Sequence, residues 1–132
     1  MRILFLTQWF QPEPDFKGLP FAKALKDKGH EVEVLTGFPN YPGGKVYSGY
    51  RVQLYQQEIM DGVEVHRVPL YPSHNKSAIC RIVNYLSFAF SAFLMGPCLF
   101  RKPDVIYVYN LVTLGLPAFF LRLLYGSKVI ID

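Results

Sequence analysis

The sequence lacks the short motifs that mark the commonest nucleotide and metal sites. None of its 132 residues form the G-x-G-x-x-G pattern of a dinucleotide-binding loop or the G-x-x-x-x-G-K-[ST] pattern of a P-loop. Its two cysteines, Cys80 and Cys98, have neither CxxC spacing nor a nearby pair of histidines. We therefore expect buried free thiols in a reducing cytoplasm, with no metal and no cofactor.

A secretory signal is also missing. The apolar start of the chain is interrupted by Gln8 and Pro12, and no small-residue cleavage site follows it. The uncharged stretch Tyr85–Phe100 has 16 residues and contains Pro97, and a helix that spans a bilayer needs about 20. We therefore expect neither a leader nor a spanning helix.

Apolar and basic residues are plentiful. Hydrophobic residues make up 51% of the chain and aromatics 16%, the mean hydropathy is +0.16, and the net charge is +4 with a pI near 9.1. The length suits one domain. The apolar excess is either buried or faces a partner, and the charge suits phospholipid, a phosphorylated substrate or nucleic acid. Composition does not choose among these.

Strand-like and helix-like patterns alternate along the chain. We predict strands at residues 3–7, 31–36, 52–59, 63–68, 104–109 and 128–131, and helices at 20–28, 77–100 and 114–125. In the first helix Phe21, Ala24 and Leu25 share one face, and Asp61-Gly62 predicts a tight hairpin turn. The fold class is α/β: a Rossmann-like, doubly wound and mainly parallel sheet with an inserted antiparallel hairpin. Ligands bind such folds at the carboxyl ends of the strands.

The chain stops on an apolar, strand-like run, residues 129–132, with no polar tail. We therefore expect residues 1–132 to be the N-terminal domain of a longer protein.

Eight segments of the chain have a familiar pattern, namely residues 1–13, 22–25, 28–36, 37–45, 61–63, 68–72, 84–88 and 103–107. Together they resemble the N-terminal domain of family 4 glycosyltransferases, in the branch that contains the fucosamine transferases of surface polysaccharide synthesis. The resemblance covers essentially the whole chain, and residues 37–45 are its most specific part.

The resemblance implies one half of a GT-B enzyme, in which two Rossmann-like domains face each other across a cleft. Such an enzyme transfers a sugar from a nucleotide donor with retention of configuration and needs no metal. This half would be the acceptor-side domain, and its acceptor would be a polyprenyl-diphosphate-linked sugar. The nucleotide-sugar donor would bind the carboxy-terminal domain, to which no segment here corresponds.

Two positions depart from the pattern of the family. Where many relatives have adjacent glycines in the loop after the first strand, this chain has Lys17 and Gly18, which we take as the donor loop. Where many relatives end a later strand with a histidine, this chain has Tyr109 and Asn110, candidate acceptor-binding residues or simply the end of a strand and a turn. No catalytic residue is assigned.

Two polar loops supply further acceptor candidates. Asn40 and Tyr41 lie in a Gly- and Pro-rich segment that either lines the acceptor pocket or only forms turns. His74 and Lys76 precede the long helix and are candidates for contact with the acceptor diphosphate; the alternative is a structural loop that caps the helix. The other two histidines, His30 and His66, are interpreted as structural.

The long apolar helix raises the question of a membrane. It is either a core helix or a helix whose exposed aromatic face touches lipid. In the second case Phe88 and Phe93 face the membrane, and Arg81, Arg101 and Lys102 meet anionic head groups. The protein would then be cytoplasmic and peripheral on the inner face of the plasma membrane, with no nucleic-acid partner.

Two rival functions stay open. One is a non-catalytic Rossmann-like module that binds an anion or a membrane. The other is one half of a sugar-nucleotide epimerase, which has the same paired-domain plan.

Overall fold

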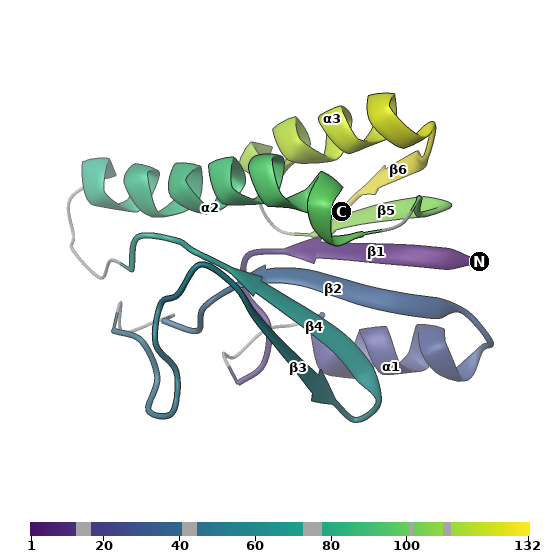
Figure 1. Cartoon of the computed structure of the whole chain (residues 1–132), viewed down its shortest axis with the longest axis horizontal. Helices are drawn as coiled ribbons and strands as arrows, with labels where there is room; N and C mark the ends of the chain where they lie inside the picture. Colours follow the sequence, from purple (N-terminus) through teal and green to yellow (C-terminus); the bar gives the residue numbers. More distant parts are fainter. Residues whose placement is uncertain (13–16, 41–44, 73–77, 101, 110–111) are drawn as a thin grey trace.

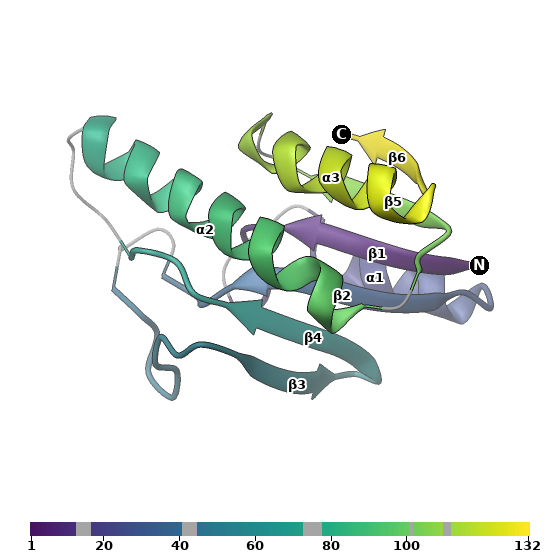
Figure 2. The same cartoon turned by 45° about the horizontal axis from the view of Figure 1, so that its top comes forward.

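One mostly parallel sheet organises the molecule (Figures 1 and 2). The computed structural model describes residues 1–132 except 13–16, 41–44, 73–77, 101 and 110–111. Its strands are β1 (Arg2–Thr7), β2 (Glu31–Gly37), β3 (Gln56–Met60), β4 (Val63–Val68), β5 (Val105–Tyr109) and β6 (Lys128–Ile131). Its helices are α1 (Leu19–Asp27), α2 (Ala78–Leu99) and α3 (Gly115–Tyr125), the last preceded by the 3-10 turn η1 (Val112–Leu114).

The strand order β3-β4-β2-β1-β5-β6 places β1 in the middle of the sheet, as its continuous apolar run predicts. The pairs β1–β2, β1–β5, β2–β4 and β5–β6 are parallel, and only β3 with β4 is antiparallel among the described strands. The predicted α/β doubly wound fold is therefore confirmed.

The hairpin takes a different place from the predicted one. Asp61 and Gly62 have φ values of 50° and 83°, so both turn residues adopt the left-handed conformation that a tight hairpin needs. However, β4 pairs in parallel with β2 and continues the winding, while β3 is an antiparallel edge strand. The hairpin therefore ends the sheet rather than interrupting it, and β3 begins at Gln56 instead of Val52.

The two faces of the sheet bury separate apolar cores. Ile3 and Phe5 of β1 pack toward α1, whereas Leu4 and Leu6 pack toward α2 and α3, because neighbouring side chains of a strand point to opposite faces. Within α1, Ala22 is buried and Ala24 is exposed. The prediction that Ala24 belongs to the buried face of the helix was therefore wrong, and Ala22 is buried instead.

Helix α2 lies along the sheet on the side opposite α1 (Figure 1). Its buried residues are Asn84, Phe88, Ala89, Ala92 and Gly96, a spacing that follows one face of a helix. The helix continues through Pro97 to Leu99, one residue short of its predicted end. The hydroxyl of Tyr125 on α3 donates to the carbonyls of Pro97 and Phe100 at 3.0 and 3.1 Å, which satisfies acceptors at the end of α2.

The cysteines differ from the prediction in their burial. Both are free thiols, but Cys80 is half-buried and Cys98 is exposed. Both lie on α2 near its outer surface, because the helix buries a single face against the sheet.

Candidate functional site

The strand order changes direction at β1, and this point locates the candidate site. From β1 the chain crosses through α1 to β2 on one side, whereas β5 and β6 add to the other side. In open α/β sheets, ligands bind outside the carboxyl ends of the strands at such a switch point. The region outside the carboxyl ends of β1 and β5 therefore has the position of a binding site.

Lys17 brings a positive charge to this region. Its Nζ donates a hydrogen bond to the Tyr107 hydroxyl at 2.9 Å and forms an ion pair with Asp132, which follows β6. The same nitrogen lies 5.4 to 5.6 Å from the ring centroids of Phe21, Tyr107 and Tyr109, within the range of cation–π attraction. We call Lys17, Tyr107, Tyr109 and Asp132 the Lys17 crevice.

Mutual electrostatics favours the charged forms of Lys17 and Asp132. The hydrogen bonds that Lys17 donates to Asp132 and Tyr107 raise the pKa of Lys17, and the bond that Asp132 accepts from Lys17 lowers the pKa of Asp132. Burial is the main cause that raises the pKa of Tyr107. The Lys17 side chain is 30% exposed, so the crevice offers a permanent ammonium group to an anionic ligand.

A buried arginine holds the loops around the crevice. Arg67 of β4 is fully buried. It donates to Glu58 at 2.7 Å, to the Gly37 carbonyl at 2.8 Å and to the Gln11 carbonyl. It thereby ties the edge strand and the end of β2 to the loop after β1. Sequence reasoning missed Arg67, because an arginine in a half-buried strand gives no sign of which face it occupies.

Gln11 and Gly18 shape the start of α1. The Gln11 side chain accepts a hydrogen bond from the Leu19 backbone N–H at 2.6 Å, at the first turn of the helix. A Cβ atom on Gly18 would collide with the Gln11 amide. The Gly18 carbonyl accepts from the N–H groups of Phe21 and Ala22, both at 3.1 Å. Packing therefore accounts for this glycine, and its role as donor loop stays a prediction.

A second polar network lies where β1 meets α2. Gln8 is fully buried and donates through Nε2 to Asn84 Oδ1 at 2.6 Å, and Asn84 donates in turn to the Tyr71 carbonyl. The Thr36 hydroxyl donates to the Gln8 carbonyl at 3.0 Å. These contacts fix the loops that follow β1 and β4 against α2. Isolated Gln and Asn residues in the sequence gave no signal for this network.

The structure brings two of the predicted site residues together, Lys17 and Tyr109. Asn40 is only 3% exposed, and its Nδ2 donates to the Phe38 carbonyl at 2.9 Å, so its amide is committed to the loop after β2. Four further predicted acceptor residues, namely Tyr41, His74, Lys76 and Asn110, lie outside the described residues.

The residues predicted to face a membrane are distributed differently. Phe88 is fully buried in the core between α2 and the sheet, so its predicted place on a membrane-facing surface was wrong. Phe93 is half-buried and packs against Phe120 with ring centroids 4.3 Å apart. Arg81 is exposed on α2, Lys102 is exposed near Asp104 at the amino ends of the strands, and Arg101 lies outside the described residues.

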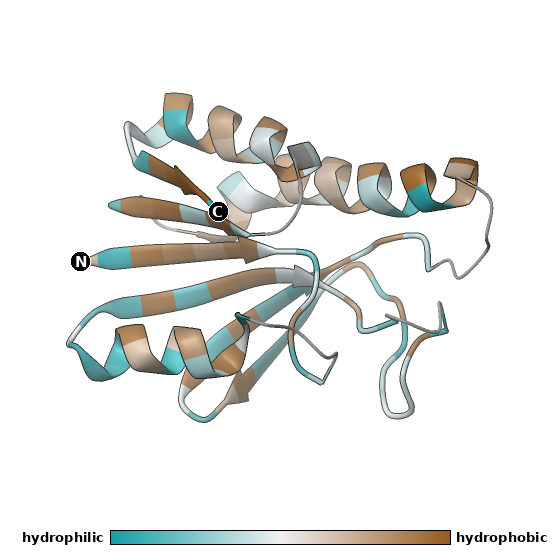
Figure 3. Ribbon diagram, turned by 180° about the vertical axis from the view of Figure 1, so that it is seen from behind, coloured by the Kyte–Doolittle hydropathy of each residue, from teal (hydrophilic) through white to brown (hydrophobic). Residues whose placement is uncertain are grey.

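Exposed apolar side chains nevertheless cover the outside of α2 and α3. Figure 3 colours much of both helices as hydrophobic. We call this surface the apolar helix face. It consists of Ile79, Ile82, Val83, Leu86, Phe90 and Leu94 of α2 and Leu116, Phe119, Leu123 and Leu124 of α3. Between the two helices runs a groove lined by Leu86, Ala89, Phe90, Phe93, Thr113 and Leu116. A monomeric domain rarely exposes so continuous an apolar surface without a partner.

In length and composition α2 resembles a helix that spans a bilayer. It has 22 residues. Its most apolar stretch of 18 residues has a mean hydropathy of 1.6, and 22% of that stretch is buried. The helix itself was predicted at residues 77–100, close to its observed bounds; only its uncharged stretch of 16 residues was compared with the thickness of a bilayer. Because α2 contributes five residues to a folded core, its contact with a membrane would be along its outer side.

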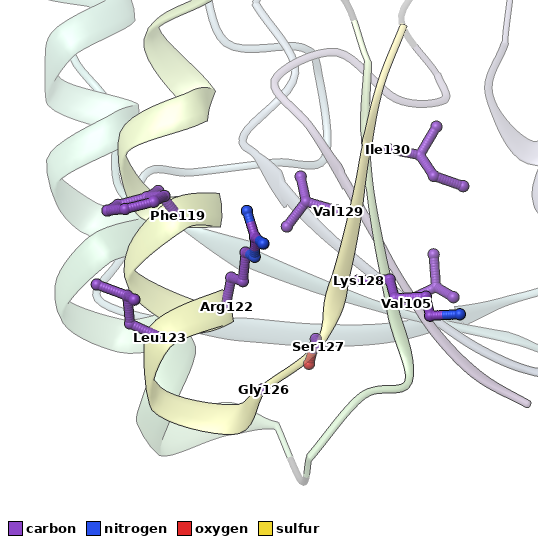
Figure 4. A pocket seen from close by; sticks show the side chains of 9 residues that line it. All are labelled: Val105, Phe119, Arg122, Leu123, Gly126, Ser127, Lys128, Val129 and Ile130. Atoms are coloured by element: carbon purple, nitrogen blue, oxygen red, sulfur yellow. The ribbon is translucent and has the colours of Figure 1, made fainter.

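A shallow hollow lies between α3 and β6, near the end of α3. Figure 4 shows Arg122 and Val129 pointing into it, whereas Ile130 points away from α3. Gly126 and Ser127 line the same hollow at the start of β6. It is therefore at the opposite end of the strands from the Lys17 crevice.

One group of side chains has donor atoms close enough together to hold a metal ion, among the residues that the structure describes. It is formed by Glu33, Glu64 and His66, whose donor atoms lie within 4.8 Å of one another. Glu33 and Glu64 are at the amino-terminal half of β2 and β4, away from the Lys17 crevice.

Comparison with known proteins gives a family match over most of the chain. Residues 19–132 match a family described as "Glycosyl transferase 4-like domain". The putative colanic acid biosynthesis glycosyl transferase WcaI of Escherichia coli K12 is 38% identical over 69 residues, which are 52% of this chain and 17% of that protein. The matched residues therefore span about a sixth of the length of this relative.

Solved structures of similar shape include the catalytic domain of starch synthase IV from Arabidopsis thaliana, bound to ADP and acarbose. It has a TM-score of 0.55 and 19% identity, covering 98% of this chain and 32% of that one. The C-terminal domain of a hydrogenase from Pyrococcus furiosus also has a TM-score of 0.55, with 16% identity. That match covers 99% of this chain and 89% of the hydrogenase domain. At such identities the two structures support the fold alone.

Proposed function

Because the chain belongs to the glycosyl transferase 4-like family, we propose that it is the acceptor-side domain of a retaining GT-B glycosyltransferase. The enzyme would transfer a sugar from a nucleotide donor to a polyprenyl-diphosphate-linked acceptor in the synthesis of a surface polysaccharide. The observation that carries the proposal is the Lys17 crevice at the switch point of the sheet.

The chemistry of transfer explains why a lysine is useful there. When the sugar is transferred, the nucleoside diphosphate leaves and negative charge develops on its diphosphate. An enzyme stabilises that charge with preorganised cations and amide dipoles. Lys17 supplies a cation that three aromatic rings surround. In the proposed complex the diphosphate replaces Asp132 as the partner of Lys17, while Tyr109 lies beside the sugar. The other donor contacts belong to a second domain outside these residues.

The apolar helix face supports a membrane location. We place the protein on the inner face of the plasma membrane, with the apolar side chains of α2 and α3 in contact with lipid. The first turns of α2 extend past the carboxyl ends of β1, β2 and β4 (Figure 1). A lipid-linked acceptor held in the membrane would therefore present its diphosphate and sugar beside the carboxyl ends of the strands.

The test is a transfer assay with the full-length protein, using radiolabelled nucleotide sugars and polyprenyl-diphosphate-linked acceptors. Lys17→Met should lower kcat/KM by about a hundredfold, the effect of removing one donor to a developing anion. Lys23→Met is the matched control, because Lys23 is exposed on α1 and outside the crevice; it should keep wild-type activity. Full-length protein that transfers no sugar from any donor, or Lys17→Met with wild-type kcat/KM, would contradict the proposal. Isomerised free sugar nucleotide would indicate an epimerase instead.

A further inference from the structure

Two carboxylates and an imidazole meet on the α2 side of the sheet, at the edge of the core. Glu33 of β2 and Glu64 of β4 are direct register partners, and His66 follows on the same face of β4 because side chains alternate along a strand. His66 Nε2 lies 3.8 Å from Glu64 Oε2. We call these three residues the Glu-Glu-His cluster.

The cluster carries two like charges, and among the described residues neither glutamate forms an ion pair with Lys or Arg. Glutamates directly opposite each other on neighbouring strands repel and destabilise the pair. Arg2, a cation whose charge acts on Glu33, forms its ion pair with Glu31 at 3.1 Å. Burial and the charge of Glu64 raise the pKa of Glu33, although the charge of Arg2 acts in the opposite direction.

His66 offers a free nitrogen to the cluster. The residue is 6% exposed and packs edge-on against Phe100, with centroids 4.9 Å apart. Its Nδ1 lies 2.6 Å from the Tyr55 hydroxyl, whereas Nε2 is buried and has no hydrogen-bond partner in the described part of the chain. In metal sites, a hydrogen bond at one ring nitrogen of a histidine orients the ring so that the other nitrogen faces the metal. The Tyr55 contact at Nδ1 has this role here. A buried polar atom without a partner otherwise costs free energy.

We propose that Glu33, Glu64 and His66 bind a divalent transition-metal ion of the Zn²⁺ type. The ligands would be one oxygen from each glutamate and His66 Nε2, with water in the fourth position. Imidazole nitrogen favours such an ion over Mg²⁺ or Ca²⁺, and its two positive charges balance the two carboxylates.

The geometry is close to what this ion needs. Donor atoms in a tetrahedral zinc site are roughly 3.4 Å apart, and those of the cluster lie within 4.8 Å. The Glu64 side chain is 46% exposed, so it can rotate toward the other two and leaves an entry path from solvent. A bound ion would join β2 to β4 and, through Tyr55, to the segment before β3. Its role would be structural, since the Lys17 crevice is at the other end of the strands.

The proposal is tested by titrating metal-free full-length protein with Zn²⁺ in a calorimeter. Wild type should bind one ion at this site. Glu64→Gln and Glu33→Gln should weaken that binding by about tenfold or more, because each removes a charged ligand. Glu31→Gln is the matched control: it removes the same charge from the neighbouring exposed position of β2 and should leave the affinity within about twofold. Circular dichroism would verify that every variant is folded.

Cobalt(II) substitution identifies the ligands. A site of nitrogen and oxygen donors gives d–d bands without the ultraviolet charge-transfer band of a thiolate. Failure of wild type to bind Zn²⁺ at micromolar concentration, or unchanged affinity in Glu64→Gln, would overturn the proposal. Binding that persists in both glutamine variants and disappears in Cys98→Ser would also overturn it, since the ion would then be held by a thiol. None of these results depends on glycosyl transfer.

Discussion

The two layers of helices cover opposite faces of one sheet, but their outer surfaces have opposite chemistry. The outer side of α1 presents charged residues, namely Lys23, Lys26, Asp27 and Lys28. The outer side of α2 and α3 presents the apolar helix face. Yet both layers bury apolar side chains against the sheet in a similar way, through Ala22 in one and Phe88 and Ala92 in the other.

This difference separates what the fold requires from what it does not. A single buried stripe is enough to hold a helix on a sheet, as α1 demonstrates with a charged exterior. The exposed apolar residues of α2 and α3 contribute little to that packing, so their presence calls for a partner outside the domain. For this reason we propose a membrane as the partner of the apolar helix face.

The largest effect is expected from two phenylalanines two positions apart on α2. Phe88 is fully buried and Phe90 is 64% exposed. Phe88→Ala should lower the free energy of unfolding by about 3 to 5 kcal/mol, because it leaves a cavity in the core. Phe90→Ala should change it by no more than about 0.5 kcal/mol. Urea unfolding followed by circular dichroism measures both, and equal losses would refute the division into an inner and an outer side.

A second prediction concerns the α1 side, where a buried charge supports the fold. Arg67→Met leaves Glu58 without its cation and frees two backbone carbonyls, so the free energy of unfolding should fall by about 3 kcal/mol. Adding Glu58→Gln should recover part of the loss, because the unpaired charge is then gone. Urea unfolding of the single and double variants is the measurement. If Arg67→Met is as stable as wild type, the contacts of Arg67 with Glu58, Gly37 and Gln11 do not support the fold.

The smallest effect is expected in the Glu-Glu-His cluster without metal. Burial raises the pKa of Glu33, so the folded state favours the protonated carboxyl, and the stability present at low pH is lost as the pH rises through that pKa. At pH 7, with a chelator present, Glu33→Gln should therefore be more stable than wild type by about 0.2 to 1 kcal/mol. The difference should vanish below pH 4.5, the ordinary pKa of the group.

His66 acts in the opposite direction and sharpens the same experiment. Burial lowers the pKa of His66, and this effect outweighs the charge of Glu64, which raises it. Glu33 and Tyr55 are the other titratable groups that face His66. The unfolded chain therefore takes up a proton near pH 6.5 while the folded state resists it, so stability falls as the pH drops below 6.5. The Glu33→Gln variant should keep this fall in the free energy of unfolding below pH 6.5. Urea unfolding curves at a series of pH values therefore distinguish the effect of His66 from that of Glu33.

Much of the fold could be predicted from the sequence because it depends on local patterns. The continuous apolar run of β1, the Asp61-Gly62 turn and the glycines 29 and 126 after α1 and α3 are each signals within a few residues. The position of β4 could not be predicted in this way. Its pairing with β2 depends on contacts between segments about 30 residues apart.

The candidate site was only partly predictable for the same reason. Lys17 and Tyr109 could be selected as residues at strand ends, but Asp132 and Tyr107 join them through contacts that span up to 115 residues of sequence. Arg67 likewise reaches the Gln11 carbonyl across 56 residues. The assignment of Phe88 to a surface failed because Phe88, Phe90 and Phe93 look alike in a uniformly apolar helix. Only the packing against the sheet decides which of them is inside.

Binding to lipid vesicles tests the central comparison most directly. The full-length protein would be sedimented with vesicles of phosphatidylethanolamine and phosphatidylglycerol. The double variant Leu86→Glu with Phe90→Glu alters the apolar helix face, and Lys23→Glu alters the outer side of α1 while lowering the net charge by the same amount. Burial of a leucine or phenylalanine is worth about 1.5 to 3 kcal/mol, so the double variant should partition at least about tenfold more weakly, whereas Lys23→Glu should change binding by less than about threefold. Equal weakening in both would mean that charge alone governs binding, and wild-type binding by the double variant would contradict our assignment of the apolar helix face to the membrane.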